Sequence, residues 1–216
     1  MGDIFREIDE ELRQERFERL WQRYGKVIIG TAVAIVVAVG GFKAFQHYQL
    51  KQRETHSAQY ASASKFLLEG KSTEAEALFS NLNEDAGSGY AVLSRFQQAA
   101  IKADAGDLLG AVKLYDQITR DNGVDKSLRD AAVIFSISRQ LDIGEIDRAK
   151  LGSRLKPLIS EKGPWRHSAL ELSGLLALQA GDLLGARELF AKISDDPEAS
   201  NNMRTRASQI LAVIGQ

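Results

Sequence analysis

The chain lacks cysteine altogether, and histidine and proline are scarce, with three of each among 216 residues. Without cysteine there is no disulfide framework, no thiolate nucleophile and no cysteine-ligated zinc. An excess of charge of one sign is also lacking, because 28 basic residues face 29 acidic ones. A nucleic-acid binder needs a basic excess to neutralise phosphates, so the charge argues against that class of function. The apolar content of 44% is nevertheless typical of a folded chain.

Recognisable catalytic motifs are missing as well. His47, His56 and His167 do not have the spacing of metal ligands. The glycines do not cluster into a phosphate-binding loop, and no serine stands in a nucleophile elbow. We therefore predict no enzyme, no catalytic, cofactor-binding or metal-binding residues and no small-molecule substrate. The function is then expected to depend on a surface.

One long uncharged run stands out against this background. Val27 to Phe42 are 16 consecutive uncharged residues, bounded by Lys26 and Lys43. With its aromatic and lysine flanks the run predicts a transmembrane helix over residues 24–45, long enough to cross a bilayer once. A buried core helix is the first alternative, but such a helix is normally amphipathic.

A cleavable signal peptide is the second alternative. Against it, 26 residues precede the run and seven of them are acidic, whereas a signal peptide begins with a short basic region. Five basic residues lie within residues 12–26 and three within residues 43–57, which favours a cytoplasmic N-terminus. The sequence thus predicts a signal anchor in a bacterial inner membrane, with the C-terminal domain in the periplasm.

Two features of this N-terminal part could contact partners. Residues 1–23 are expected to form a charged, amphipathic helical arm in the cytoplasm, although its role is open. Within the span, Gly30, Ala34 and Ala38 follow one another at four-residue spacing. Small residues at that spacing allow a second helix to approach closely, but glycine and alanine are also common in membrane helices.

Residues 46–216 contain an internal repeat. Residues 105–111 and 180–186 read the same seven letters, Ala-Gly-Asp-Leu-Leu-Gly-Ala. The repeat predicts turn glycines at Gly70, Gly106, Gly144 and Gly181, and packing alanines five residues later at Ala75, Ala111, Ala149 and Ala186. An aromatic residue follows four residues further on in three copies, and Ser153 is the exception.

A glycine turn followed by a small residue and an aromatic residue is typical of two antiparallel helices joined tightly. The period is close to that of the tetratricopeptide repeat. We therefore predict an all-α chain: one N-terminal transmembrane helix, then a tetratricopeptide-like α-solenoid of about four helix pairs. An amphipathic helix over residues 201–214 is expected to cap the last pair.

The first helices of the pairs are expected to line a groove. Counting ten residues back from each turn glycine gives Tyr60, Phe96, Ile134 and Glu171. The three apolar positions would suit an unfolded or extended apolar peptide, although Phe96 also continues a helical stripe that could belong to the core. Trp165 is open to two interpretations, recognition at a repeat edge or packing.

The segment from Trp21 to Gly30 and the two identical seven-residue copies resemble the YfgM-like family of ancillary SecYEG translocon subunits, in proteobacterial members with tetratricopeptide-like repeats. This resemblance spans nearly the whole chain. It implies a protein that faces the periplasm and works beside chaperones on newly exported proteins. The charged arm over residues 3–19 departs from the family pattern, so the partner could differ.

Two hypotheses follow for the function. The first is a non-enzymatic, membrane-anchored protein–protein interaction module, whose partners are translocon subunits, periplasmic chaperones or exported clients. The second is an envelope assembly scaffold for division or cell-wall machinery. The sequence leaves open the identity of the partner and the oligomeric state.

Overall fold

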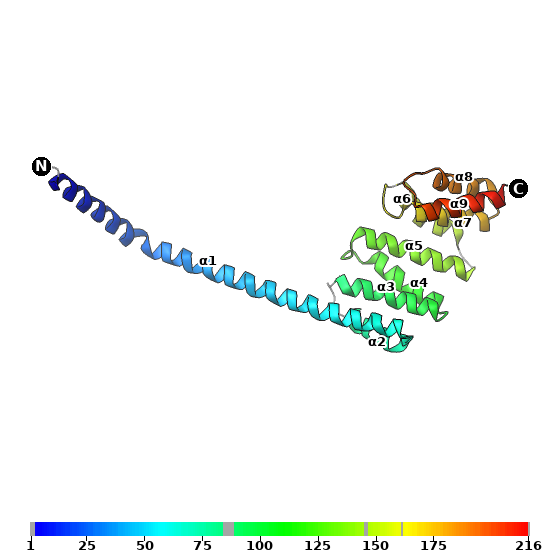
Figure 1. Cartoon of the computed structure of the whole chain (residues 1–216), viewed down its shortest axis with the longest axis horizontal. Coiled ribbons are helices and arrows are strands. Elements are labelled where there is room, and N and C mark those ends of the chain that lie inside the picture. Colours follow the sequence, from blue (N-terminus) through cyan, green and yellow to red (C-terminus); the bar gives the residue numbers. More distant parts are fainter. Residues whose placement is uncertain (1–2, 84–88, 145–146, 161, 216) are drawn as a thin grey trace. The chain divides into compact units, whose positions relative to one another are not determined.

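A computed structural model describes residues 3–83, 89–144, 147–160 and 162–215, with side chains from Trp21 onward except those of Ile28 and Ala32. The described residues form nine α-helices and no strand, so the all-α prediction is confirmed. The chain divides into two compact units, Met1–Thr55 and His56–Gln216. Each unit is described separately below (Figure 1).

The first unit is part of a single helix, α1 (Asp3–Leu68), whose C-terminal end belongs to the second unit. Within α1, one stretch is long and apolar enough to cross a membrane. Its large apolar side chains are exposed, including Val36, Val37 and Phe42. No protein surface of the unit covers them, unlike the buried side chains of a soluble core helix. The side chains of the arm before Trp21 lie outside the described residues, so its amphipathic character stays a prediction.

The second unit is a solenoid of helix pairs. The end of α1 pairs with α2 (Ser72–Asn83), α3 (Gly89–Asp104) with α4 (Leu108–Arg120), α5 (Lys126–Ile143) with α6 (Arg148–Ser160), and α7 (Arg166–Gln179) with α8 (Leu183–Ser194). Helix α9 (Asn201–Ile214) packs on α8 and covers the last pair. The predicted four pairs and closing helix are confirmed.

The repeated seven residues build the turn between two helices. Gly106 and Gly181 have φ angles of 84° and 76°, a region that side chains with a Cβ avoid. The backbone N–H groups of Gly106 and Asp107 donate back to the carbonyls of Ala103 and Lys102, which closes the end of α3 as a Schellman motif. The Asp107 carboxylate then caps α4 by accepting from the Gly110 N–H at 2.8 Å. A Cβ on Gly110 would meet that carboxylate, so the Asp107 side chain would have to shift if Gly110 were replaced.

The third pair keeps its glycine but places it differently. Helices α3 and α7 end two residues before their turn glycine, whereas α5 ends at Ile143, one residue before Gly144. Because one residue turns a helix by about 100°, positions counted back from Gly144 and positions counted back from Ile143 lie on neighbouring faces of α5. Seven residues before the glycine α5 has Ile137, which is fully buried like Ala99 but larger.

Helix α6 is shifted as well, and this corrects the prediction for Ala149. The carboxylate that accepts from the first turn of α6 is that of Asp147, three residues after Gly144 rather than one. Ala149 is consequently exposed, whereas Ala75, Ala111 and Ala186 are fully buried. Four residues after the cap the third pair has Leu151, and the aromatic position is taken by Leu155. Ser153 is therefore not a defect in the core but an exposed residue.

The larger Leu151 changes how the helices pack. In the other pairs an alanine at this position lets the second helix lie close to the first. In the third pair α6 packs chiefly on α7, while α5 packs chiefly on α4 (Figure 1). One cluster of buried leucines and isoleucines joins α5, α6 and α7. The two helices of the third pair, α5 and α6, thus pack less closely on each other than the helices of the second and fourth pairs do.

Candidate functional site

The second unit carries an apolar hollow on its first-helix side, which we call the aromatic groove. Its volume is about 350 Å³. It is lined by Leu93, Phe96, Gln97 and Ala100 of α3, Tyr115 of α4, Leu128, Ala131 and Phe135 of α5, and Trp165 just before α7. Leu93 and Phe135 are each 39% exposed. A solvent-exposed apolar concavity of this kind is typical of a surface that receives an apolar side chain.

Four aromatic rings form a continuous ladder through this groove. The Phe135 ring stacks on Tyr115 with centroids 5.6 Å apart and meets Phe96 edge-on at 6.0 Å. Phe96 also contacts Tyr115, and Trp165 meets Phe135 edge-on at 6.4 Å. Rings held by one another lose little freedom when a ligand binds, so the surface is rigid before binding.

Trp165 packs inside the fold and also lies at the edge of the groove, so both interpretations from the sequence apply to it. Its Nε1–H donates to the backbone carbonyl of Ser127 at 2.8 Å, which fixes the indole against the start of α5. The ring also packs against the buried cluster of α5, α6 and α7. The same ring lines the aromatic groove. Trp165 is thus a packing residue whose free face contributes to the groove.

The polar atoms at the groove are neutral. Burial raises the pKa of Tyr115, with Asp104 acting in the same direction and Arg139 opposing it, so the phenol is protonated at neutral pH. The Gln97 amide donates to the Tyr60 hydroxyl at 3.1 Å. Neutral donors among apolar walls suit a peptide chain better than an ionic ligand.

The residues that the sequence analysis predicts to line a groove do not lie on one surface. Phe96 lines the aromatic groove, whereas Tyr60 packs against Phe79 and Tyr90 at the first pair. Ile134 is buried in the core, so its assignment to the groove is wrong. Because α5 is shifted by one residue relative to its glycine, the neighbouring Phe135 takes that place. Glu171 is bound by Arg206 of α9 through two hydrogen bonds of 2.9 and 2.8 Å.

Phe135 is the residue of the aromatic groove that the sequence analysis missed. The signal that would have found it is the end of the helix rather than the glycine, since counting from Ile143 aligns Phe135 with Phe96. In the first unit, Gly30, Ala34 and Ala38 are exposed along α1, and their predicted role in helix association stays a prediction.

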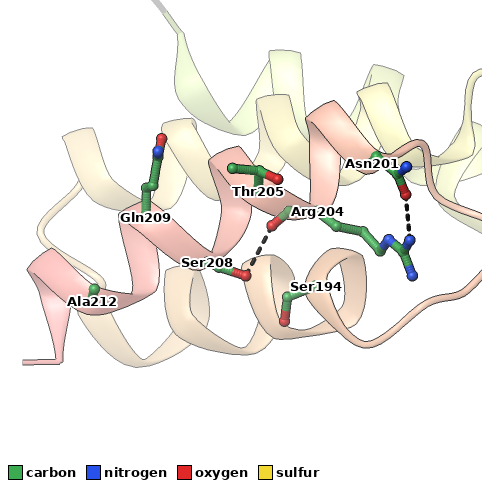
Figure 2. Close-up of a pocket in the computed structure, with 7 residues that line it drawn as sticks. All are labelled: Ser194, Asn201, Arg204, Thr205, Ser208, Gln209 and Ala212. Atoms are coloured by element: carbon green, nitrogen blue, oxygen red, sulfur yellow. Dashed lines mark hydrogen bonds between the residues drawn. The ribbon is translucent and has the colours of Figure 1, made fainter.

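Other hollows of the second unit are less suited to a ligand. One of about 570 Å³ lies between α8 and α9, lined by Ser194, Asn201, Arg204, Thr205, Ser208, Gln209 and Ala212 (Figure 2). Its polar groups already bond within α9: Ser208 donates to the carbonyl of Arg204, and Arg204 to the Asn201 side chain. An apolar hollow of about 400 Å³ lies between Leu178 and the end of α9. Neither contains an aromatic ring.

Several ionisable side chains of the described residues join parts of the fold. Among them, no group of three or more His, Asp or Glu could hold a metal ion. The Asp196 carboxylate is bound by Arg166 and by His167 at 3.2 and 3.0 Å, which ties the loop before α9 to the start of α7. Arg154 of α6 reaches Asp116 of α4 at 2.7 Å, and Ser136 donates to the same carboxylate oxygen.

Stacked helix pairs with an apolar groove on the first-helix side define a repeat protein of the protein-binding class. The chain belongs to the tetratricopeptide repeat-like domain family, whose sequence model matches residues 18–211. No curated protein and no solved structure matches the chain. The family supports a protein–protein interaction module and protein partners in general.

Proposed function

We propose that the chain is a membrane-anchored interaction module that holds apolar segments of exported proteins near the translocon. The observation that carries this proposal is the aromatic groove, where Phe96, Phe135 and Trp165 offer a rigid apolar surface to solvent. Unfolded proteins expose apolar side chains that folded proteins bury, so such a groove distinguishes the two.

The proposed topology rests on the first unit. Residues 24–45 cross the inner membrane once, residues 1–23 lie in the cytoplasm, and residues 46–216 lie in the periplasm. The exposed apolar side chains of α1 support this arrangement, as do the five basic residues within 12–26 against three within 43–57. A tether raises the local concentration of a weak binding site, so a modest affinity suffices at the membrane.

The groove is tested by the fluorescence of Trp165. In a Trp21→Phe background, Trp165 is the remaining tryptophan, and unfolded outer-membrane protein should change its emission in a saturable manner. Phe135→Ala should weaken the binding about tenfold, because aromatic anchors dominate such contacts. Leu184→Ala is the matched control, since that leucine is 75% exposed outside the groove. Equal effects of the two variants would contradict the groove assignment.

The cellular part of the proposal has its own test. Crosslinking of the full chain in its membrane should recover translocon subunits or periplasmic chaperones, and alkaline carbonate should not extract the protein. Recovery of a single folded cell-wall or division enzyme instead would favour the assembly scaffold. A reporter fused after residue 216 that reads out in the cytoplasm would remove the export role.

A further inference from the structure

Helix α6 differs from the other second helices of the pairs in its charge. It carries four basic residues, Arg148, Lys150, Arg154 and Lys156, and no carboxylate. By contrast, α2 carries two carboxylates and no basic residue, and α4 and α8 each carry two basic residues and one carboxylate. Among the second helices of the pairs, the positive charge is therefore concentrated on α6, in a chain whose net charge is −1.

Only one of these four side chains is used inside the fold. Arg154 is half-buried and bound to Asp116. Arg148, Lys150 and Lys156 are exposed, and the outer face of α6 also presents the exposed Ala149 and Ser153 between them and Ser160 after them. Small side chains beside the lysines leave room for another chain to approach the helix closely.

The shifted register of the third pair produces this surface. Because the cap of α6 comes two residues later than in the other pairs, Ala149 and Ser153 turn outward while Leu151 and Leu155 take their places in the core. The face we describe is thus a consequence of the same shift that opens the third pair.

We propose that the outer face of α6, formed by Lys150, Ser153 and Lys156, is a docking site for an acidic polypeptide segment. The cations lie along about two turns of helix, so carboxylates spaced along an extended chain or a second helix can each meet one. The site lies on a second helix of the solenoid and shares no lining residue with the aromatic groove, so it goes beyond the proposed function.

A polypeptide fits this face better than other anionic partners. The exposed large apolar residues of the second unit include none from α6, and a helix that binds a membrane surface needs such residues to insert. A nucleic acid requires a basic excess over a whole surface, which a chain of net charge −1 lacks.

The test uses the full chain in uncharged detergent micelles and a labelled peptide of alternating Glu and Ser. A peptide with Gln in place of Glu is the probe control. We expect the Glu peptide to bind about tenfold more tightly than the Gln peptide at low salt, with the difference falling as salt is added. Equal binding of the two peptides would overturn the proposal.

Variants then locate the site. Lys150→Glu with Lys156→Glu should abolish the preference for Glu, and Lys150→Arg with Lys156→Arg should keep it. Lys113→Glu with Lys192→Glu is the matched control, because these exposed lysines lie on α4 and α8 and change the net charge equally. A loss of the same size in that control would show a general charge effect and overturn the site.

A second measurement needs no substitution. The Glu peptide should protect Lys150 and Lys156 of the unmodified protein from acetylation, while Lys113 and Lys192 stay reactive. Uniform protection of all four lysines would contradict the assignment to α6. Binding to vesicles of anionic phospholipid, with no binding of the Glu peptide, would assign the face to a membrane surface and equally overturn the proposal.

Discussion

The second and fourth helix pairs share seven identical residues at their turns, whereas the third pair keeps only the glycine and shifts the register on both sides of it. In the regular pairs the small and aromatic residues of the repeat all serve the turn and the core. In the third pair the same positions in the sequence lie at the surface, and larger residues fill the core. The comparison teaches that the cap of a helix, and not the glycine before it, sets which residues are buried.

The largest expected effect tests that statement directly. Leu155→Ala should lower the free energy of unfolding by about 2–5 kcal/mol, because Leu155 is fully buried at the aromatic position of the pair. Ser153→Ala, at the position counted from the glycine, should change it by less than about 0.5 kcal/mol. Thermal unfolding of the full chain in detergent, followed by near-ultraviolet circular dichroism, measures both. The reverse order of the two effects would show that the register is not shifted.

Two glycines inside helices sharpen the comparison, because replacing each with alanine is expected to change the free energy of unfolding in opposite directions. A Cβ on Gly174 of α7 would lie 2.7 Å from the Phe190 ring, so Gly174→Ala should destabilise the fold by about 1–3 kcal/mol. A Cβ on Gly152 of α6 meets nothing within 4 Å, so Gly152→Ala should stabilise it by about 0.5–1 kcal/mol. Urea titration of the two variants checks the signs. Destabilisation by both would mean that α6 packs as closely as α7.

The hydrogen bond that joins α6 to α4 is expected to have a smaller effect on stability. Arg154→Met removes the charged hydrogen bond from α6 to Asp116 and should cost about 1–2 kcal/mol, reduced by partial exposure to water. Arg139→Met is the control, because Arg139 meets Asp142 only at 3.4 Å and should cost less than about 0.5 kcal/mol. Hydrogen exchange should show faster opening of α6 in the first variant alone. Equal exchange in both variants would assign no role to the link.

The smallest expected effect is on the pH dependence of stability, and it concerns Asp121 at the end of α4 in the second pair. Arg95 and the backbone N–H of Gly123 hold the pKa of Asp121 below its ordinary value, through hydrogen bonds to the ionised carboxylate. A lowered pKa means that the stabilisation is present above the ordinary carboxyl pKa and is lost as the pH falls through the value in the folded state. The melting temperature of Asp121→Asn should therefore lie below that of the wild type at neutral pH and approach it in acid.

The control for this last prediction is Asp104→Asn, at an exposed carboxylate. Its difference from the wild type should be smaller at neutral pH than that of Asp121→Asn. A gap for Asp121→Asn that widens in acid would have the wrong sign and would contradict the role of Arg95.

The sequence predicts the architecture well, because glycine turns and buried alanines are local signals that recur at a nearly constant spacing. Gly70, Gly106, Gly144 and Gly181 all adopt positive φ angles. The sequence predicts the groove poorly, because a groove depends on which face each helix presents. A shift of one residue in α5 exchanged Ile134 for Phe135, and nothing in the glycine spacing signals that shift. The cap at Asp147 becomes interpretable only when its bond to the Lys150 N–H is seen.

The cap formed by Asp107 and Gly110 has a consequence for protein engineering. A Cβ on Gly110 would meet the carboxylate of Asp107 in its present position, so the two residues fit one another and form a transferable unit. Since the same unit occurs at Asp182 and Gly185, it tolerates two different pairs of neighbouring helices. Such a cassette is suited to joining helices in designed repeat arrays, where the choice of connector decides how closely successive helices lie.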